Sequence, residues 1–142
     1  MDIFLILGDQ LFPAKHLTPF KRMSVFMAED MHLCDRYKFH KHKLVFFLSA
    51  MRHYRKSLEE KGFKVNYHTL EEGHTTNYID KLEKFLTKND TTQLHSFEVE
   101  NHFMVKLIQD YCNSAKIEWI QHPSPMFSCS KEKFNSLSLI HI

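Results

Sequence analysis

The stretch 4-FLILGDQLFP-13 near the start of the chain decides the fold. Its apolar residues run directly into Gly-Asp-Gln, and such an uninterrupted run is typical of a central parallel strand buried on both faces. Gly8 is expected to turn the chain there with a positive φ at little cost. Asp9 and Gln10 then lie at the carboxyl edge of the strand, which is where open α/β sheets usually bind their ligands.

Outward from this stretch, short apolar runs alternate with helical patterns. Strands are predicted at residues 3–7, 25–28, 63–70, 94–99 and 117–120. Apolar residues spaced three and four apart predict helices at residues 40–61, 78–86 and 103–115. Such alternation with short connections indicates βαβ units. We therefore predict an α/β fold: a single doubly wound, five-stranded parallel sheet with helices on both faces, in which strand one is central and adjacent to strand two.

Composition limits the function classes. A chain of 142 residues suits one domain, and its formal net charge of +2 is too weak to argue for nucleic acid by itself. The sequence contains neither an apolar run long enough to span a membrane nor a secretory signal. The three cysteines, Cys34, Cys112 and Cys129, form no CxxC pair, which favours reduced thiols and a cytoplasmic location.

Polar residues follow the first two predicted strands, as Gly8-Asp9-Gln10 and as Glu29-Asp30. If the two strands are neighbours, these side chains converge on one rim and suit hydrogen bonding to the hydroxyls and ring N–H groups of a polar cofactor. Acidic residues at strand ends also serve as caps for the next helix, and spacing alone leaves both interpretations open.

Other candidate sites are weaker. His40 and His42 would lie about 200° apart around a helix, so they cannot share a metal ion, and we predict no metal site. The basic ridge of Arg52, Arg55 and Lys56 is more typical of a solvated helix face than of a phosphate site. With no GxSxG elbow in the chain, we predict no catalytic residues.

Longer stretches carry a resemblance. The segments ILGDQLFP (6–13), YKFHKHKLVFFLSAMRHYRKSLEEKGFKVNY (37–67), LHSFEVEN (94–101) and HPSPMFSCSKEKF (122–134) resemble the N-terminal domain of the photolyase-related family. That family contains the iron–sulfur bacterial cryptochromes and (6-4) photolyases. The resemblance covers residues 1–135, and we interpret the atypical tail, residues 136–142, as a truncation point.

The resemblance implies an N-terminal α/β domain that holds an antenna chromophore, a ribityl lumazine in characterised members. FAD, a four-cysteine iron–sulfur cluster and the DNA lesion would belong to a larger C-terminal domain. Matched by position, the antenna site falls on Gly8, Asp9, Gln10, Leu11, Glu29, His40, Lys43 and Phe47, and the strand-end argument adds Asp30. Many relatives carry a second acid where this chain has Leu33, which leaves the identity of the antenna open.

Two functions are therefore predicted from sequence. The first is the antenna-binding domain of a cryptochrome- or photolyase-related flavoprotein. On its own it is predicted to have no DNA repair activity and to bind neither FAD nor the iron–sulfur cluster, for which three cysteines cannot supply four thiolates. The alternative is a stand-alone α/β module that binds a nucleotide-like ligand or a protein partner without photochemistry. In the first case an exposed domain interface should cause self-association. Its candidate residues are Phe20, Phe127, Leu137, Leu139 and Ile140.

Overall fold

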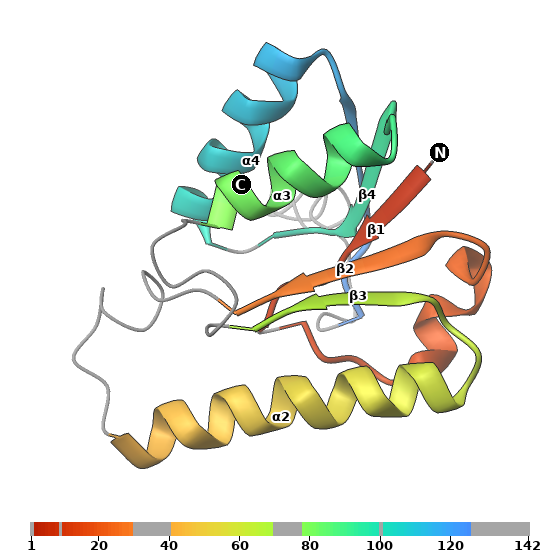
Figure 1. Ribbon diagram of the computed structural model, residues 1–142, viewed down its shortest axis with the longest axis vertical. Coiled ribbons are helices and arrows are strands. Elements are labelled where there is room, and N and C mark those ends of the chain that lie inside the picture. Colours follow the sequence, from red (N-terminus) through yellow and green to blue (C-terminus); the bar gives the residue numbers. More distant parts are fainter. Residues whose placement is uncertain (1, 9, 30–40, 70–77, 100, 126–142) are drawn as a thin grey trace, which may run out of the picture.

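The computed structural model describes residues 2–8, 10–29, 41–69, 78–99 and 101–125. They form one five-stranded sheet in which every neighbouring pair is parallel, with the order β3-β2-β1-β4-β5 (Figure 1). The predicted fold class is confirmed, with β1 central and next to β2. The strands are β1 (Asp2–Leu5), β2 (Ser24–Ala28), β3 (Val65–His68), β4 (Gln93–Phe97) and β5 (Glu118–His122).

Three α-helices connect the later strands. They are α2 (Lys41–Glu60), α3 (Tyr78–Lys88) and α4 (His102–Ala115), and α2 is the longest of them, as its sequence pattern predicts. The connection from β1 to β2 is a short 3-10 helix, η1 (Ala14–Phe20), with Pro19 inside it. The sequence pattern predicted no helix there, because a few tight turns produce no extended apolar stripe.

Two of the helices end at residues that favour a helix stop. Gly62 follows α2 with a φ of +88°, in the left-handed region that glycine adopts without steric cost. After α3, Asn89 donates from Nδ2 to the carbonyl of Phe85 at 2.8 Å, and Asp90 has a φ of +48°. These ends return the chain to the sheet at the start of the next strand.

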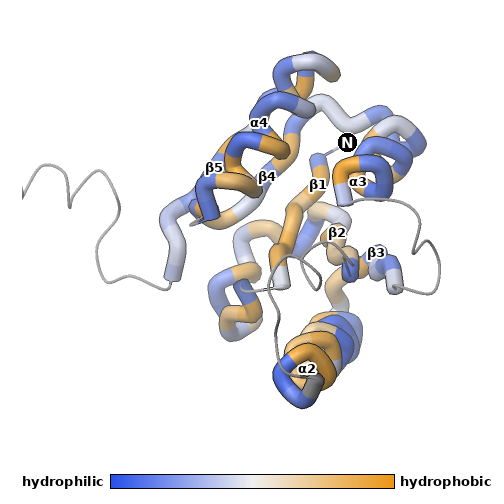
Figure 2. Tube along the Cα trace, turned by 90° about the vertical axis from the view of Figure 1, so that its left-hand side faces the viewer, coloured by the Kyte–Doolittle hydropathy of each residue, from blue (hydrophilic) through white to orange (hydrophobic). Residues whose placement is uncertain are grey.

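The sheet is covered on both faces, with α2 on one side and α3 and α4 on the other (Figure 1). Ile3, Leu5 and Leu7 face α3 and α4, whereas Phe4 and Ile6 face α2. All five are at most 6% exposed, as expected for a central parallel strand. In Figure 2 the apolar stretch of β1 lies between the helical layers.

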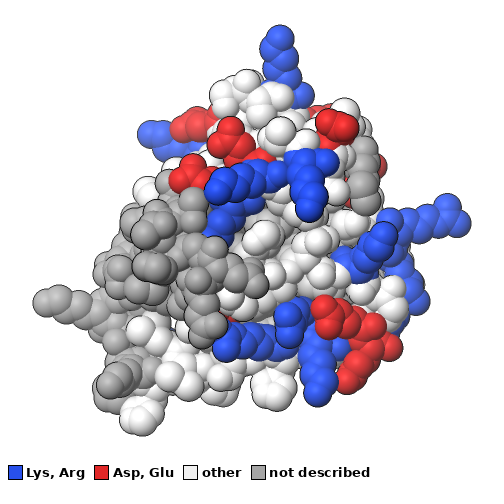
Figure 3. All heavy atoms as spheres, in the orientation of Figure 1, with Lys and Arg blue, Asp and Glu red and all other residues white. Residues whose placement is uncertain are grey.

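One face of the molecule illustrates the distribution of charge. On the face shown in Figure 3, Lys and Arg side chains lie among Asp and Glu side chains, in keeping with the small net charge of the chain. Within the part of the chain that the structure describes, no helix is both long enough and apolar enough to cross a membrane.

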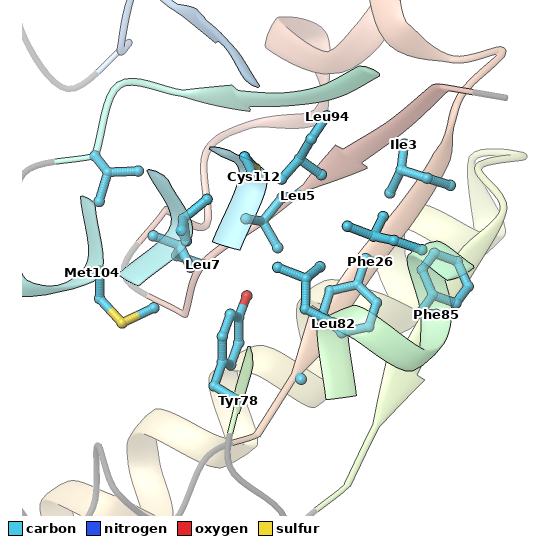
Figure 4. Close-up of a cluster of buried hydrophobic side chains, with 14 residues drawn as sticks. Ile3, Leu5, Leu7, Phe26, Tyr78, Leu82, Phe85, Leu94, Met104 and Cys112 are labelled. Atoms are coloured by element: carbon cyan, nitrogen blue, oxygen red, sulfur yellow. The ribbon is translucent and has the colours of Figure 1, made fainter. Parts of the chain in front are cut away.

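Aromatic packing joins the sheet to α3 (Figure 4). Phe26 of β2 is fully buried, and its ring centroid lies 5.1 Å from that of Phe85 and 6.2 Å from that of Tyr78. His68 of β3 closes the same cluster at 5.2 Å from Phe26. Phe26 thus links two strands and one helix.

One predicted interface residue is not a free surface group. Phe20 at the end of η1 is only partly exposed, and its ring centroid lies 4.7 Å from that of Phe4 and 4.5 Å from that of His122. The other predicted interface residues, Phe127, Leu137, Leu139 and Ile140, lie outside the described part of the chain.

Replacing Phe26 with Ala should lower the free energy of unfolding by about 3–5 kcal/mol, because the change leaves a cavity between β2 and α3. Phe103→Ala is the matched control, since Phe103 is 46% exposed, and it should change stability by less than about 0.5 kcal/mol. Urea unfolding followed by circular dichroism measures both. Equal losses in the two variants would contradict the core described here.

Candidate functional site

The candidate site lies at the carboxyl edge of the sheet, beside the topological switch point. The chain builds outward from β1 to β2 and β3, then returns to place β4 on the other side of β1. Connections leave β1 and β4 in opposite directions, and ligands of open α/β sheets usually bind where this occurs. Gln10 follows β1 at this edge, and Glu98 follows β4.

Gln10 bridges these two strand ends. Its side-chain Nε2 donates to the main-chain carbonyl of Glu98 at 2.9 Å, and its residue is only 5% exposed. A carbonyl oxygen only accepts hydrogen bonds, so the amide must present its nitrogen to Glu98. The other end of the amide, Oε1, is buried and accepts no hydrogen bond from any of the residues that the structure describes. A buried acceptor without a donor is costly, which makes Oε1 a fitting partner for a ligand N–H or hydroxyl group.

Gly8 has a different role from the predicted one. Its φ is not in the left-handed region, so the expected turn with positive φ is wrong. Glycine is needed for space instead: a Cβ at this position would lie 2.5 Å from Cζ of Phe47 and 3.0 Å from Sδ of Met51. The ring of Phe47 on α2 therefore packs directly against the main chain that follows β1.

Glu29 lies at the end of β2 and is almost completely buried, with 1% of its surface exposed. Arg52 of α2 binds its carboxylate with two hydrogen bonds, from Nε at 3.0 Å and from Nη2 at 2.9 Å. The hydroxyl of Tyr67 on β3 donates to the same carboxylate at 2.7 Å. This network joins β2, β3 and α2 at the edge of the sheet.

The network changes the titration of its members. The hydrogen bond and negative charge of Glu29 raise the pKa of Arg52 above its ordinary value, so this guanidinium stays charged. Burial, followed by the hydrogen bond to Glu29 and the charge of its carboxylate, raises the pKa of the Tyr67 hydroxyl, which therefore remains a donor near neutral pH. The predicted solvated ridge on α2 is thus partly wrong: Arg52 is engaged with Glu29, although half of its side chain is exposed.

The predicted residues do not form a single cluster. Gln10 and Glu29 both lie at the carboxyl edge, but Gln10 bonds toward β4 and Glu29 toward α2 and β3. Leu11 is partly buried against the cluster on the α2 side of the sheet, and Lys43 is exposed near the start of α2. Asp9, Asp30 and His40 lie outside the described residues.

Lys81 is a member of the edge that sequence reasoning missed. Its ammonium reaches from α3 to donate to the main-chain carbonyl of Glu29 at 2.8 Å, and the residue is 7% exposed. A signal was present, because Lys81 interrupts the apolar stripe of Tyr78, Leu82 and Phe85. A charged residue within such a stripe indicates a buried polar contact.

Metal and thiol chemistry find no support among the described residues, where no group of three His, Cys, Asp or Glu side chains is arranged to hold an ion. Cys112 of α4 is buried among apolar side chains, and burial raises the pKa of its thiol to about 11. A thiol with such a pKa is protonated and unreactive near neutral pH.

Fold and edge together define a doubly wound α/β domain with polar side chains at the carboxyl edge of its sheet. Residues 4–138 match the family of deoxyribodipyrimidine photo-lyase-related proteins, and the chain belongs to that family. The resemblance seen in the sequence is thereby confirmed.

A curated relative agrees with this assignment. The chain is 36% identical over 69 residues to a (6-4) photolyase of Agrobacterium fabrum (strain C58), an alignment that covers 46% of this chain. The same alignment spans 14% of that relative.

Arg52→Met should lower the free energy of unfolding by about 2–4 kcal/mol, because it leaves the buried Glu29 carboxylate without its cation. Lys56→Met is the matched control on the same helix. Because Lys56 is exposed, this change should alter the free energy of unfolding by less than about 0.5 kcal/mol. Urea unfolding measures both. The double variant Glu29→Gln/Arg52→Met should recover part of the loss, and strictly additive effects would contradict the ion pair.

Proposed function

We propose that this chain is an antenna-chromophore-binding domain of a cryptochrome- or photolyase-related flavoprotein. Membership of the family supports the proposal. The observation that carries it is the buried Oε1 of Gln10 beside the topological switch point, which has no hydrogen-bond partner within the described part of the chain. The proposed ligand is a ribityl lumazine or a similar aromatic chromophore, whose ring N–H or hydroxyl group would donate to this oxygen. The fixed amide orientation would make Gln10 selective for a donor.

Two further features support a flat aromatic ligand at this edge. Phe47 packs over Gly8, two residues before Gln10 in the chain, and is only partly buried, so it offers an aromatic surface that suits an aromatic ring better than a sugar alone. Glu29 already binds Arg52 and Tyr67, so we propose that it supports the pocket wall.

DNA repair is a proposal for a larger assembly of domains. The aligned relative is a (6-4) photolyase of which this chain matches a small part. We propose that FAD, an iron–sulfur cluster and the DNA lesion are bound by a second domain, and that this chain alone binds chromophore without repairing DNA. The alternative is a module that binds another nucleotide-like ligand. A chromophore titration distinguishes this module from the antenna-binding domain.

Gln10→Met should weaken binding of a ribityl lumazine by about 5- to 150-fold, as expected when one buried hydrogen-bond partner worth about 1–3 kcal/mol is removed. Fluorescence titration of the purified chain gives the dissociation constant. Gln93→Met is the matched control, because Gln93 begins β4 at the opposite edge and bonds Glu118 on the surface at 3.0 Å.

The control variant should bind as tightly as the wild type. No saturable binding by the wild-type chain, or equal affinities for wild type and Gln10→Met, would contradict the proposed function. Circular dichroism of each variant shows whether a loss of binding arises from a loss of fold.

A further inference from the structure

A histidine pair joins β4 to the edge strand β5. Nδ1 of His95 and Nε2 of His122 are 3.0 Å apart, and the two rings stack with centroids 5.3 Å apart and an angle of 8° between their planes. Phe20 of η1 packs on His122 with a centroid distance of 4.5 Å, and His95 is only 7% exposed. The facing nitrogens are therefore largely shielded from water.

The surroundings select one tautomer for this pair. Nε2 of His95 faces the carboxylate of Asp2 on β1, with Oδ2 at 3.8 Å. At this distance the contact is electrostatic and not a hydrogen bond. A carboxylate still favours a proton on the nitrogen that faces it, and in the tautomer it favours, Nδ1 of neutral His95 is an acceptor. His122 then donates from Nε2. The order is Asp2, His95, His122, with each ring proton directed toward the amino end of β1.

The same histidine is connected to the proposed ligand site through one residue, Glu98. The main-chain carbonyl of His122 accepts a hydrogen bond from the amide N–H of Glu98 at 2.8 Å. The carbonyl of Glu98 in turn accepts the hydrogen bond from Nε2 of Gln10 at 2.9 Å. A shift of the end of β5 therefore moves the group that orients the Gln10 amide.

We propose that the His95–His122 pair is a pH-sensitive clasp that holds the end of β5, and with it Glu98 and Gln10, and that opens when both rings are protonated. One added proton is tolerated, since the charged ring still donates to the neutral one. A second proton places an N–H on both facing nitrogens, which replaces the hydrogen bond with repulsion between two cations.

The charges around the pair are few. Asp2 approaches from β1, and Glu118 lies on the same side of β5, where its carboxylate accepts from Gln93. The groups that pack on the pair from β1 and η1, Phe4 and Phe20, are uncharged aromatic rings. Among the described residues, Asp2 is thus the acidic group that pairs with either histidine.

Burial, and then the positive charge of His95, lower the pKa of His122 below its ordinary value. In the unfolded chain a histidine titrates near a pKa of about 6.5, so below that pH the unfolded state binds more protons than the folded one. The stability contributed by neutral His122 is therefore fully present above about pH 6.5 and is lost as the pH falls through the folded-state pKa.

Urea unfolding of the 142-residue chain between about pH 8 and pH 5 tests the clasp. For one extra proton bound by the unfolded state, the unfolding constant rises by up to about tenfold per pH unit. His122→Gln should remove the part of the pH dependence of the unfolding constant that arises from His122. The introduced glutamine amide can donate to His95 but does not titrate. His53→Gln, at an exposed histidine of α2, should keep the wild-type dependence. Wild-type pH dependence in His122→Gln would overturn the clasp.

Heteronuclear NMR of the wild-type chain gives a second test without any substitution. The His122 ring should titrate below the ordinary histidine pKa of about 6.5. The amide of Glu98 and the side-chain amide of Gln10 should shift with the His122 midpoint. Resonances of Glu98 and Gln10 that stay constant through that titration would overturn the link to Gln10.

The clasp needs no ligand, and its effect on chromophore affinity rests on the proposed function. The two are distinguishable in the same samples. If the resonances of Glu98 and Gln10 shift with His122 in a chain that binds no chromophore, the clasp is supported. The missing chromophore binding then counts against the proposed function and not against the clasp.

Discussion

The parallel pairing of β1 with β2 on one side and β4 on the other constrains everything at the candidate site. Its register places Phe4 opposite Val25 and His95, so the three strands advance together and end at one edge. Because β1 is buried on both faces, its position cannot adjust without disturbing both cores. That pairing determines the positions of Gln10 and Glu29.

Helix α2 serves both stability and the site. It covers one face of the sheet, with Met51 and Leu58 in the core, and the same helix supplies Arg52 to Glu29 and Phe47 to Gly8. The buried carboxylate therefore contributes to the position of α2 as well as to the chemistry of the edge. Substitutions on the inner side of α2 should change packing and the ligand surface together.

The fold was predictable because it follows from patterns within single segments. The apolar run at residues 4–7 and the apolar spacing within residues 40–61 each specify an element without reference to the rest of the chain. Alternating strands and helices then leave few topologies, of which the observed order is one. The end of α2 at Gly62 is likewise a local property, because glycine adopts a positive φ without steric cost.

Of the candidate site, only the presence of polar groups at the carboxyl edge was predictable. That polar groups gather at the carboxyl edge follows from a parallel sheet, but no local pattern pairs Glu29 with Arg52 or brings His95 to His122. Gly8 is a further example. The position requires glycine because the ring of Phe47, which is distant in sequence, occupies the space where a Cβ would lie. Contacts of this kind depend on tertiary packing, which cannot be predicted from the spacing of residues in the sequence.

The central claim is that the edge beside Gln10 is where a chromophore binds. A titration of the isotope-labelled chain with a ribityl lumazine, followed by heteronuclear NMR, tests it most directly. The account predicts that the largest shifts occur at Gly8, at Glu98 and at the side-chain amide of Gln10. Gln93 and Glu118, at the opposite edge of the sheet, should be unaffected. Largest shifts at that opposite edge, or none at any residue, would contradict the account.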